Sequence, residues 1–213
     1  MVVHALDAAR AARRVDRALV ATDDERIAAC VRAAGGEAVL TSPNAASGTD
    51  RVAEIARSFA ADVYVNVQGD EPLMSPENID RAVDLLERPD RAIATLAYPV
   101  GAEAGADPGV VKVAVSRDGR ALYFSRSPIP YDRGGHVPYR KHLGLYAFRA
   151  ATLAQIAALT PSPLEMAESL EQLRWLEAGY TIWIGEAAED SVGVDTPADL
   201  LEAERRMRKE VSS

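Results

Sequence analysis

Short apolar runs alternate with amphipathic stretches over the first hundred residues of the chain. Apolar runs of this length predict buried parallel strands, and apolar positions three or four residues apart predict helices. We predict strands at residues 17–21, 37–40, 63–67 and 91–100, and helices at 4–14, 27–34, 49–59 and 76–86. Because strands and helices alternate, the pattern favours an α/β fold with a parallel sheet covered on both faces.

The second half of the chain has a different pattern. Three strand-like runs, joined by an Asp-Gly turn and a proline-rich loop, predict antiparallel strands added onto the parallel sheet. These strands are expected at residues 110–116, 120–126 and 142–149, within an antiparallel insertion at about 110–149. Helices follow at 150–159 and 163–178, then a strand at 181–187 and an amphipathic helix at 195–210. Since the sequence has no repeat or linker, we predict one domain over residues 1–213.

Composition and charge narrow the classes of function. The chain has 213 residues, 48% of them apolar, and 24 Lys and Arg against 32 Asp and Glu give a net charge of −8. This acidic balance argues against binding to nucleic acid or to anionic membranes. The N-terminus lacks an apolar secretion core, so we expect a cytoplasmic protein. A single cysteine, Cys30, excludes an internal disulfide, and its helical phase predicts a small core residue.

Two acidic residues are candidates for metal binding. Asp70 lies in QGDEP, directly after the predicted strand at 63–67, where open α/β sheets bind ligands. Its carboxylate could hold Mg²⁺, although Gly-Asp-Glu-Pro is also ordinary turn sequence. Asp195 lies in GVDTP and could be a second ligand, but Asp-Thr-Pro before an apolar run is also a common start of a helix. Both interpretations stay open for each residue.

Other polar segments are candidates for anion or nucleotide binding. The segment SGTDR, with Ser47 and Thr49, offers backbone N–H groups to an anion or a base at a helix start, or simply caps the helix. Arg126, Arg140 and Lys141 flank the proline-rich loop, where arginine could bind a carboxylate or phosphate, or form a solvated basic patch. A further polar group on the helix at 163–178 is expected to be mostly solvated, with one or two members able to reach a ligand: Glu165, Glu168, Glu171, Gln172 and Arg174.

Several common catalytic motifs are absent from the sequence. It contains no G-x-x-x-x-G-K-[ST], no G-x-G-x-x-G after a strand, no G-x-S-x-G and no H-E-x-x-H. These absences weigh against nucleotide hydrolysis on a P-loop, dehydrogenase chemistry on a glycine fingerprint, serine hydrolysis and zinc protease chemistry.

The segments VNVQGDEP, LYFSR, YRKHLGLYAFR, LEQLR and GVDTPADL, in this order, resemble the 3-deoxy-manno-octulosonate cytidylyltransferase (CMP-Kdo synthetase) family. The resemblance covers nearly the whole chain. It implies a Rossmann-like nucleotide-diphospho-sugar transferase sheet, mostly parallel, with an antiparallel dimerisation insertion. It also implies an enzyme that transfers CMP from CTP to 3-deoxy-D-manno-octulosonate (Kdo), releases pyrophosphate, activates Kdo for lipopolysaccharide synthesis, requires Mg²⁺ and forms a homodimer.

The resemblance also implies roles for individual residues. Asp70 and Asp195 correspond to the catalytic carboxylates that bind the metal, and Ser47 and Thr49 to the region near the cytosine and ribose. The positions that line the Kdo pocket in the family are matched here by Gln68, Arg126, His142, Glu171 and Gln172.

The sequence departs from the family pattern at its start. Family members begin with a strand and a basic loop that grips the CTP phosphates, and Met1 aligns just after that loop. We therefore expect the slot between the strands at 17–21 and 63–67 to be empty, or these strands to pair directly. Two alternatives stay open: a cytidylyltransferase for a related acidic sugar, such as 8-amino-Kdo or a sialic acid, or a non-catalytic remnant without the CTP clamp.

Overall fold

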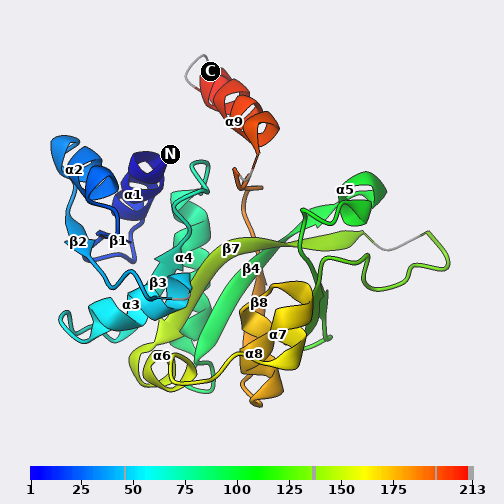
Figure 1. Ribbon diagram of the computed structural model, residues 1–213. Helices are drawn as coiled ribbons and strands as arrows, with labels where there is room; N and C mark the ends of the chain where they lie inside the picture. The colour runs from blue at the N-terminus through cyan, green and yellow to red at the C-terminus, as the bar shows by residue number, and fades with distance from the viewer. Residues whose placement is uncertain (46, 136–137, 195, 211–213) are drawn as a thin grey trace. The chain divides into compact units, whose positions relative to one another are not determined.

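The computed structural model describes residues 1–45, 47–135, 138–194 and 196–210 (Figure 1). The chain divides into two compact units, and each is described by itself. Unit 1 comprises Met1–Ala60, Asn66–Asp80 and Ala188–Ser213, and unit 2 comprises Ala61–Val65 and Arg81–Ala187. The single domain over residues 1–213 stays a prediction. None of the helices within the described ranges combines the length and apolar content of a membrane span.

Unit 1 contains a parallel pair of short strands, β1 (Val20–Thr22) and β2 (Ala38–Leu40). Its helices are α1 (Val2–Ala11), α2 (Glu25–Ala33), α3 (Gly48–Ala56) and α9 (Pro197–Glu210), and α4 (Pro76–Asp84) begins in this unit. The side chain of Asp24 accepts a hydrogen bond from the backbone of Arg26 and so caps α2, as an aspartate at this position favours. Helix α2 buries Ala28 and Val31.

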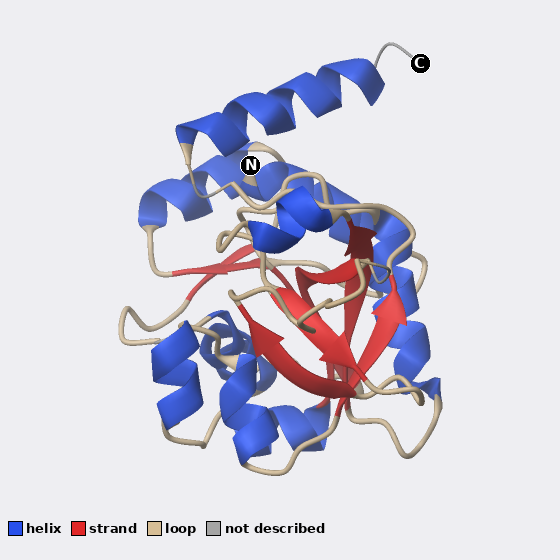
Figure 2. Ribbon diagram, turned by 90° about the vertical axis from the view of Figure 1, so that its right-hand side faces the viewer, coloured by secondary structure: helices blue, strands red, loops and turns tan. Residues whose placement is uncertain are grey.

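The sheet of unit 2 has the strand order β6-β5-β7-β4-β8, and β3 pairs with β7. Figure 2 draws the strands of the chain in red. Its strands are β4 (Ile93–Val100), β5 (Lys112–Val115), β6 (Ala121–Ser125), β7 (Tyr139–Arg149), β8 (Ile182–Glu186) and β3 (Val63–Val67), whose last two residues belong to unit 1. The helical segments are η1 (Leu85–Glu87), α5 (Ala102–Ala106), α6 (Ala150–Ile156), α7 (Pro163–Glu168) and α8 (Gln172–Glu177). The pair β4–β8 is parallel, whereas β7 is antiparallel to β4 and β5. The sheet is therefore mixed, and the predicted α/β class is confirmed.

Strand β7 takes a more central place than the sequence predicted. We expected the strand at 142–149 to be added onto a sheet formed by the earlier strands, but β7 pairs with β3, β4 and β5. Its residues Leu143, Leu145, Ala147 and Phe148 are buried, as in a strand covered on both faces.

The predicted slot beside β1 is not closed by direct pairing. Among the described residues β1 pairs with β2 and β3 pairs with β7, so the strands predicted at 17–21 and 63–67 form no ladder with each other. The spacing that would mark an empty slot stays a prediction.

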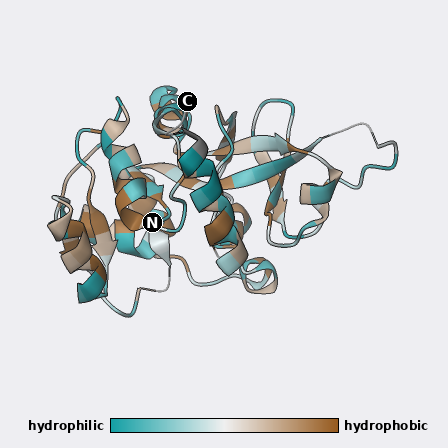
Figure 3. Ribbon diagram, turned by 90° about the horizontal axis from the view of Figure 1, so that it is seen from above, coloured by the Kyte–Doolittle hydropathy of each residue, from teal (hydrophilic) through white to brown (hydrophobic). Residues whose placement is uncertain are grey.

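Three local features differ from the sequence prediction. Helix α5 was not predicted, and the helix expected at 163–178 is broken at Ser169, whose φ of 53° ends α7 in a left-handed turn. Cys30 was predicted to be a core residue, which is wrong: it is exposed, because it lies off the face of α2 that buries Ala28 and Val31. Helices with both hydrophilic and hydrophobic positions are visible along the chain in Figure 3.

Candidate active site

The first candidate segment lies at the start of α3 in unit 1. Ser47 is the N-cap residue, and its side chain accepts a hydrogen bond of 3.1 Å from the backbone N–H of Asp50. Thr49, in the first turn, is only 1% exposed. A Cβ atom on Gly48 would lie 3.1 Å from Asn66 Nδ2 and 3.3 Å from Gln68 Nε2. The structure therefore brings the predicted nucleotide segment against the side chain of Gln68.

The amide of Asn66 is an unexpected part of this region. Asn66 is 7% exposed, and its Nδ2 has no hydrogen-bond partner among the described residues. A buried amide donor without an acceptor costs about 1–3 kcal/mol. Its position beside Gly48 places this donor next to the N-terminus of α3, where an anionic group is favoured.

The predicted metal ligand Asp70 follows β3 and is exposed in the turn after that strand. Its backbone carbonyl accepts a hydrogen bond of 2.9 Å from the N–H of Val194. This bond holds the segment that leads to position 195 beside the turn of Asp70. Asp195 itself lies outside the described residues, so the distance between the two carboxylates stays a prediction.

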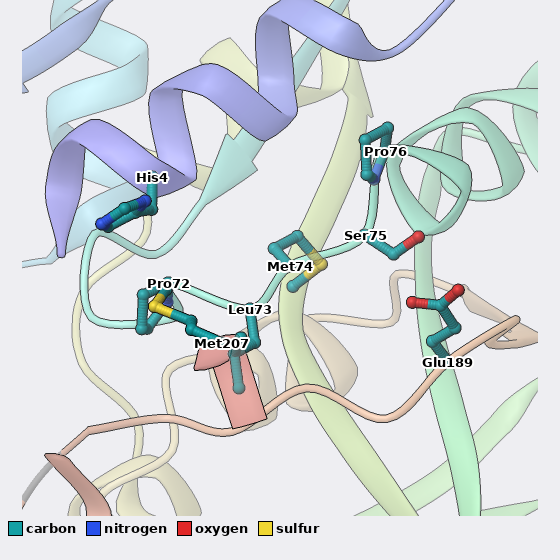
Figure 4. A pocket seen from close by; sticks show the side chains of 8 residues that line it. All are labelled: His4, Pro72, Leu73, Met74, Ser75, Pro76, Glu189 and Met207. Atoms are coloured by element: carbon teal, nitrogen blue, oxygen red, sulfur yellow. The ribbon is translucent and has the colours of Figure 1, made fainter. Parts of the chain in front are cut away.

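A pocket of about 580 Å³ lies within unit 1, and Pro72, the last residue of QGDEP, is among the residues that line it (Figure 4). His4 from α1 and Met207 from α9 line it together with Glu189 and the segment 72–76. Its apolar lining side chains are Pro72, Leu73, Met74, Pro76 and Met207. None of the predicted site residues lines this pocket.

In unit 2, His142 is a half-buried, neutral side chain on β7. Its Nε2 lies 3.0 Å from Thr95 Oγ1 on β4, and the Thr95 hydroxyl lies 2.5 Å from the carbonyl oxygen of Leu145. Because that carbonyl can only accept, the hydroxyl donates to it and in turn accepts from His142 Nε2–H. Burial lowers the pKa of His142 to about 3. The ring therefore carries no charge at pH 7, and its Nδ1 is left as an acceptor.

Aromatic rings surround His142. Its ring centroid lies 5.1 Å from those of Phe124 and Tyr146, and the Tyr146 ring lies 5.0 Å from that of Trp175. In the part of the chain that the structure describes, the hydroxyl of Tyr146 and Nε1 of Trp175 are buried without a hydrogen-bond partner. Burial, together with the charge of Glu171, raises the pKa of Tyr146 well above its usual value. Two donors without a partner among the described residues therefore lie close to two residues predicted to bind the sugar, His142 and Glu171.

Arg126 follows β6 and is fixed by α7 and by the segment before β5. Its backbone N–H donates to Glu168 Oε2 at 2.9 Å, and its Nε donates to the Glu168 carbonyl at 3.0 Å. A third bond of 3.2 Å joins its Nη1 to the carbonyl of Pro108. Both guanidinium partners are neutral carbonyls, and no carboxylate among the described residues pairs with this side chain. The positive charge therefore remains available to an anion.

The polar group predicted on one solvated helix is largely engaged, so that prediction is wrong. Glu165 and Arg174 form a bidentate ion pair, with contacts of 2.6 and 2.8 Å and side chains 14% and 7% exposed. Glu168 binds Arg126, and Gln172 is 5% exposed at the start of α8. The physical reason is the turn at Ser169, which separates α7 from α8 and gives the two helices different faces to bury.

The predicted sugar residues are thus only partly brought together. Arg126 lies two residues after Phe124, whose ring contacts His142, and the charge of Glu171 acts on the neighbouring Tyr146. Gln68 belongs to unit 1 and the other four to unit 2, so a pocket shared by all five stays a prediction. Sequence reasoning missed the roles of Thr95, Tyr146 and Trp175, for which only their buried polar groups give a signal.

Comparison with known proteins defines the class. A family profile described as cytidylyltransferase matches residues 1–183. A 3-deoxy-manno-octulosonate cytidylyltransferase of Anaeromyxobacter sp. (strain Fw109-5) is 52% identical over 204 residues, covering 94% of this chain and 83% of the relative. One of Acidobacterium capsulatum is 48% identical over 200 residues, covering 93% and 82%.

A solved structure supports the same relationship. CMP:2-keto-3-deoxy-manno-octonic acid synthetase complexed with CTP is 41% identical to the chain, with a TM-score of 0.92, over 98% of this chain and 88% of that one. The chain therefore belongs to the cytidylyltransferases and, among these, to the 3-deoxy-manno-octulosonate cytidylyltransferase family. The family resemblance inferred from the sequence motifs is confirmed.

Proposed function

We propose that the chain transfers CMP from CTP to Kdo. In this reaction the anomeric hydroxyl oxygen of Kdo attacks the α-phosphorus of CTP, the bond to the β-phosphate oxygen breaks, and pyrophosphate leaves. The observation that carries the proposal is the identity of about half of all aligned positions with cytidylyltransferases named for this substrate. Phosphoryl transfer of this kind needs little covalent chemistry from the protein, so positioning and charge neutralisation are the tasks of its side chains.

Unit 2 supplies groups suited to an acidic sugar. The guanidinium of Arg126 can accept the sugar carboxylate, because its present partners are neutral carbonyls. His142 is uncharged, so its role is to accept a hydrogen bond from a sugar hydroxyl through Nδ1 rather than to attract the carboxylate. Glu171 and Gln172, at the start of α8, complete the proposed set of sugar ligands.

Unit 1 supplies groups suited to the nucleotide. Ser47 and Thr49 place the N-terminus of α3 at the proposed position of the cytosine and ribose, beside the amides of Asn66 and Gln68. Gln68 lies beside this nucleotide segment. The family resemblance implies that it also lines the sugar pocket.

Asp70 and Asp195 would hold Mg²⁺, a hard cation that prefers carboxylate and phosphate oxygens. Two observations fit this assignment: the Asp70 residue is exposed, and its carbonyl holds Val194, the residue before Asp195. When bound, the metal would neutralise charge on the CTP phosphates. The two aspartates would contribute carboxylate oxygens to the metal.

The wider role follows from the same reaction. We include in the proposal that the enzyme works in the cytoplasm, where CTP is made, and that its product enters lipopolysaccharide synthesis. We also propose a homodimer formed through the antiparallel insertion. In support, Leu122 is 63% exposed on the edge strand β6, and Tyr131 in the following loop is 87% exposed. Sedimentation of the purified chain tests the dimer.

The activity is tested by pyrophosphate release with each of the four nucleoside triphosphates and a panel of acidic sugars. The proposal predicts release only with CTP, and fastest with Kdo among Kdo, 8-amino-Kdo and sialic acid. Faster release with sialic acid would assign the chain to a different sugar. Absence of release with every sugar, from a folded chain, would indicate a protein that has lost catalysis.

A further inference from the structure

Lys112 on β5 is a buried cation that donates hydrogen bonds to three backbone carbonyl groups. The residue is 0% exposed, and its ammonium donates to the carbonyl oxygens of Asp107, Val110 and Arg126 at 2.7, 2.6 and 2.5 Å. An ammonium has three N–H donors, so these bonds use its full capacity. A buried charge costs several kcal/mol of desolvation unless it is paired or hydrogen-bonded in this way.

Two of these three contacts involve the surroundings of Arg126. Lys112 holds the carbonyl of Arg126 itself and the carbonyl of Asp107, the neighbour of Pro108. Pro108 in turn accepts from Arg126 Nη1. Lys112 thus fixes both the backbone that carries the arginine and the chain that supports its guanidinium.

Glu168 completes this frame from α7. Its carboxylate accepts from Ser125 Oγ at 2.6 Å and from the Arg126 N–H at 2.9 Å, while its carbonyl accepts from Arg126 Nε. The arginine is therefore bound through Nε and one Nη1 hydrogen. The outer edge of the guanidinium, formed by Nη2 and the second Nη1 hydrogen, has no acceptor within the described ranges. This edge is the one that binds a carboxylate in bidentate fashion.

The charges around Lys112 also connect it with Arg126. Burial and the nearby charge of Arg126 lower the pKa of Lys112, whereas Asp107 and Glu168 raise it. Two cations therefore lie close together in a chain whose net charge is −8. The carboxylates of Asp107 and Glu168 offset part of the repulsion between these cations, and its three hydrogen bonds hold Lys112 beside Arg126.

We propose that Lys112 is a positioning residue of the sugar site, which holds the guanidinium of Arg126 in place for the carboxylate of the acidic sugar. This inference rests on the proposed function. Neither Lys112 nor Glu168 need touch the substrate: they act by fixing Arg126, since small displacements of a binding group cost large factors in affinity and rate.

The test replaces Lys112 with methionine, which keeps the chain length and removes the charge and all three bonds. The matched control is Arg149→Met at the last residue of β7, because Arg149 also donates to backbone carbonyls, those of Leu86 and Arg91 at 2.5 and 2.9 Å. Both variants should melt at a lower temperature. Only Lys112→Met should raise the KM for Kdo, by about tenfold or more, with the KM for CTP unchanged.

A second variant covers the case in which Lys112→Met does not fold. Glu168→Gln keeps the shape of the side chain but replaces one acceptor oxygen with a donor, so it should loosen Arg126 and give the same selective rise in the KM for Kdo. Calorimetric titration of Kdo into each protein should show the matching loss of affinity. An unchanged KM for Kdo in both variants, or an equal rise for Kdo and CTP, would overturn the proposal.

The wild-type chain separates this failure from failure of the proposed function. If the wild type neither binds Kdo nor releases pyrophosphate with it, the proposed function is wrong, and the role of Lys112 in sugar binding is wrong with it. If the wild type does both and the variants keep its KM for Kdo, only the positioning role is wrong.

Discussion

The candidate groups of the two units are held in different ways. In unit 1, Ser47 is a helix cap and Asp70 is exposed in a turn, so the local backbone places them. In unit 2, Gln172 is buried, His142 is half-buried, and Arg126 is fixed by bonds from two other segments. Substitutions in unit 1 should therefore reduce activity with little loss of stability, whereas in unit 2 they should reduce both. The predictions below test this difference, beginning with the largest expected effect.

Asp70→Asn should reduce CMP-Kdo formation on the order of 100-fold or more, because it removes a charge from the proposed metal site. The melting temperature should change little, since Asp70 is exposed. Steady-state kinetics at saturating Mg²⁺ and a thermal melt measure the two effects. Asp16→Asn, at another exposed aspartate of unit 1, is the control and should retain full activity. If Asp70→Asn retains its activity, the proposal that Asp70 binds the metal is wrong.

Glu165→Gln should reduce the free energy of unfolding by about 3 kcal/mol, because Arg174 is then left buried without its charge partner. Glutamine can preserve part of the capping box with Ser162, so the loss reports mainly on the ion pair. Urea unfolding followed by circular dichroism gives the value. Glu202→Gln, in an exposed pair on α9 of unit 1, should have a much smaller effect. Equal losses in the two variants would contradict the comparison between the units.

The stability of the fold should depend on pH through the protonation of His142. Its folded pKa is about 3 against an ordinary value of 6.5, so the unfolded state binds more protons between these pH values. Stability should therefore be full above pH 6.5 and decrease as the pH falls toward 3, by on the order of a few kcal/mol. Urea midpoints at pH 4 to 7 measure the slope.

The same experiment has a matched pair of variants. His142→Gln should flatten the slope between pH 4 and 6.5, because the group that must be neutral in the folded state is gone. His4→Gln, at an exposed histidine of unit 1, should keep the wild-type slope. A slope that survives in His142→Gln would assign the acid sensitivity to other groups.

Gly48→Ala should give the smallest effect, a rise of a few-fold in the KM for CTP. The added Cβ would lie 3.1 Å from Asn66 Nδ2 and 3.3 Å from Gln68 Nε2, so the start of α3 must shift by a fraction of an ångström. Gly101→Ala, where nothing lies within 4 Å of the added atom, is the control. The KM for Kdo should stay constant in both variants, and a larger change for Kdo than for CTP would contradict the nucleotide assignment.

Much of the fold could be predicted because its signals are local. The apolar run of β3 and the proline at the start of α4 fixed these elements within a residue or two, and the motif VNVQGDEP pointed to the family. The turn at Ser169 was missed because its left-handed φ is unusual for serine and has no glycine to mark it. The central place of β7 was missed because strand order depends on pairing partners that lie far apart in sequence.

The candidate site was less predictable for the same reason. The bonds of Lys112 connect residues 107, 110 and 126, and Glu168 reaches back by more than 40 positions to Ser125. The periodicity of apolar residues along the sequence does not predict contacts between residues so far apart. The neutral state of His142 likewise depends on burial among Thr95, Phe124 and Tyr146, which come from three strands.

The most direct test of the proposed activity is to follow the new bond itself. Kdo labelled with ¹³C at its anomeric carbon is incubated with CTP, Mg²⁺ and the chain, and ³¹P and ¹³C spectra are recorded during the reaction. Transfer of CMP predicts a phosphodiester signal whose phosphorus couples to the labelled carbon, together with one pyrophosphate for each CTP consumed. CTP that stays intact, or that yields CMP without coupling to the labelled carbon, would contradict the assignment of this chain as an active Kdo cytidylyltransferase.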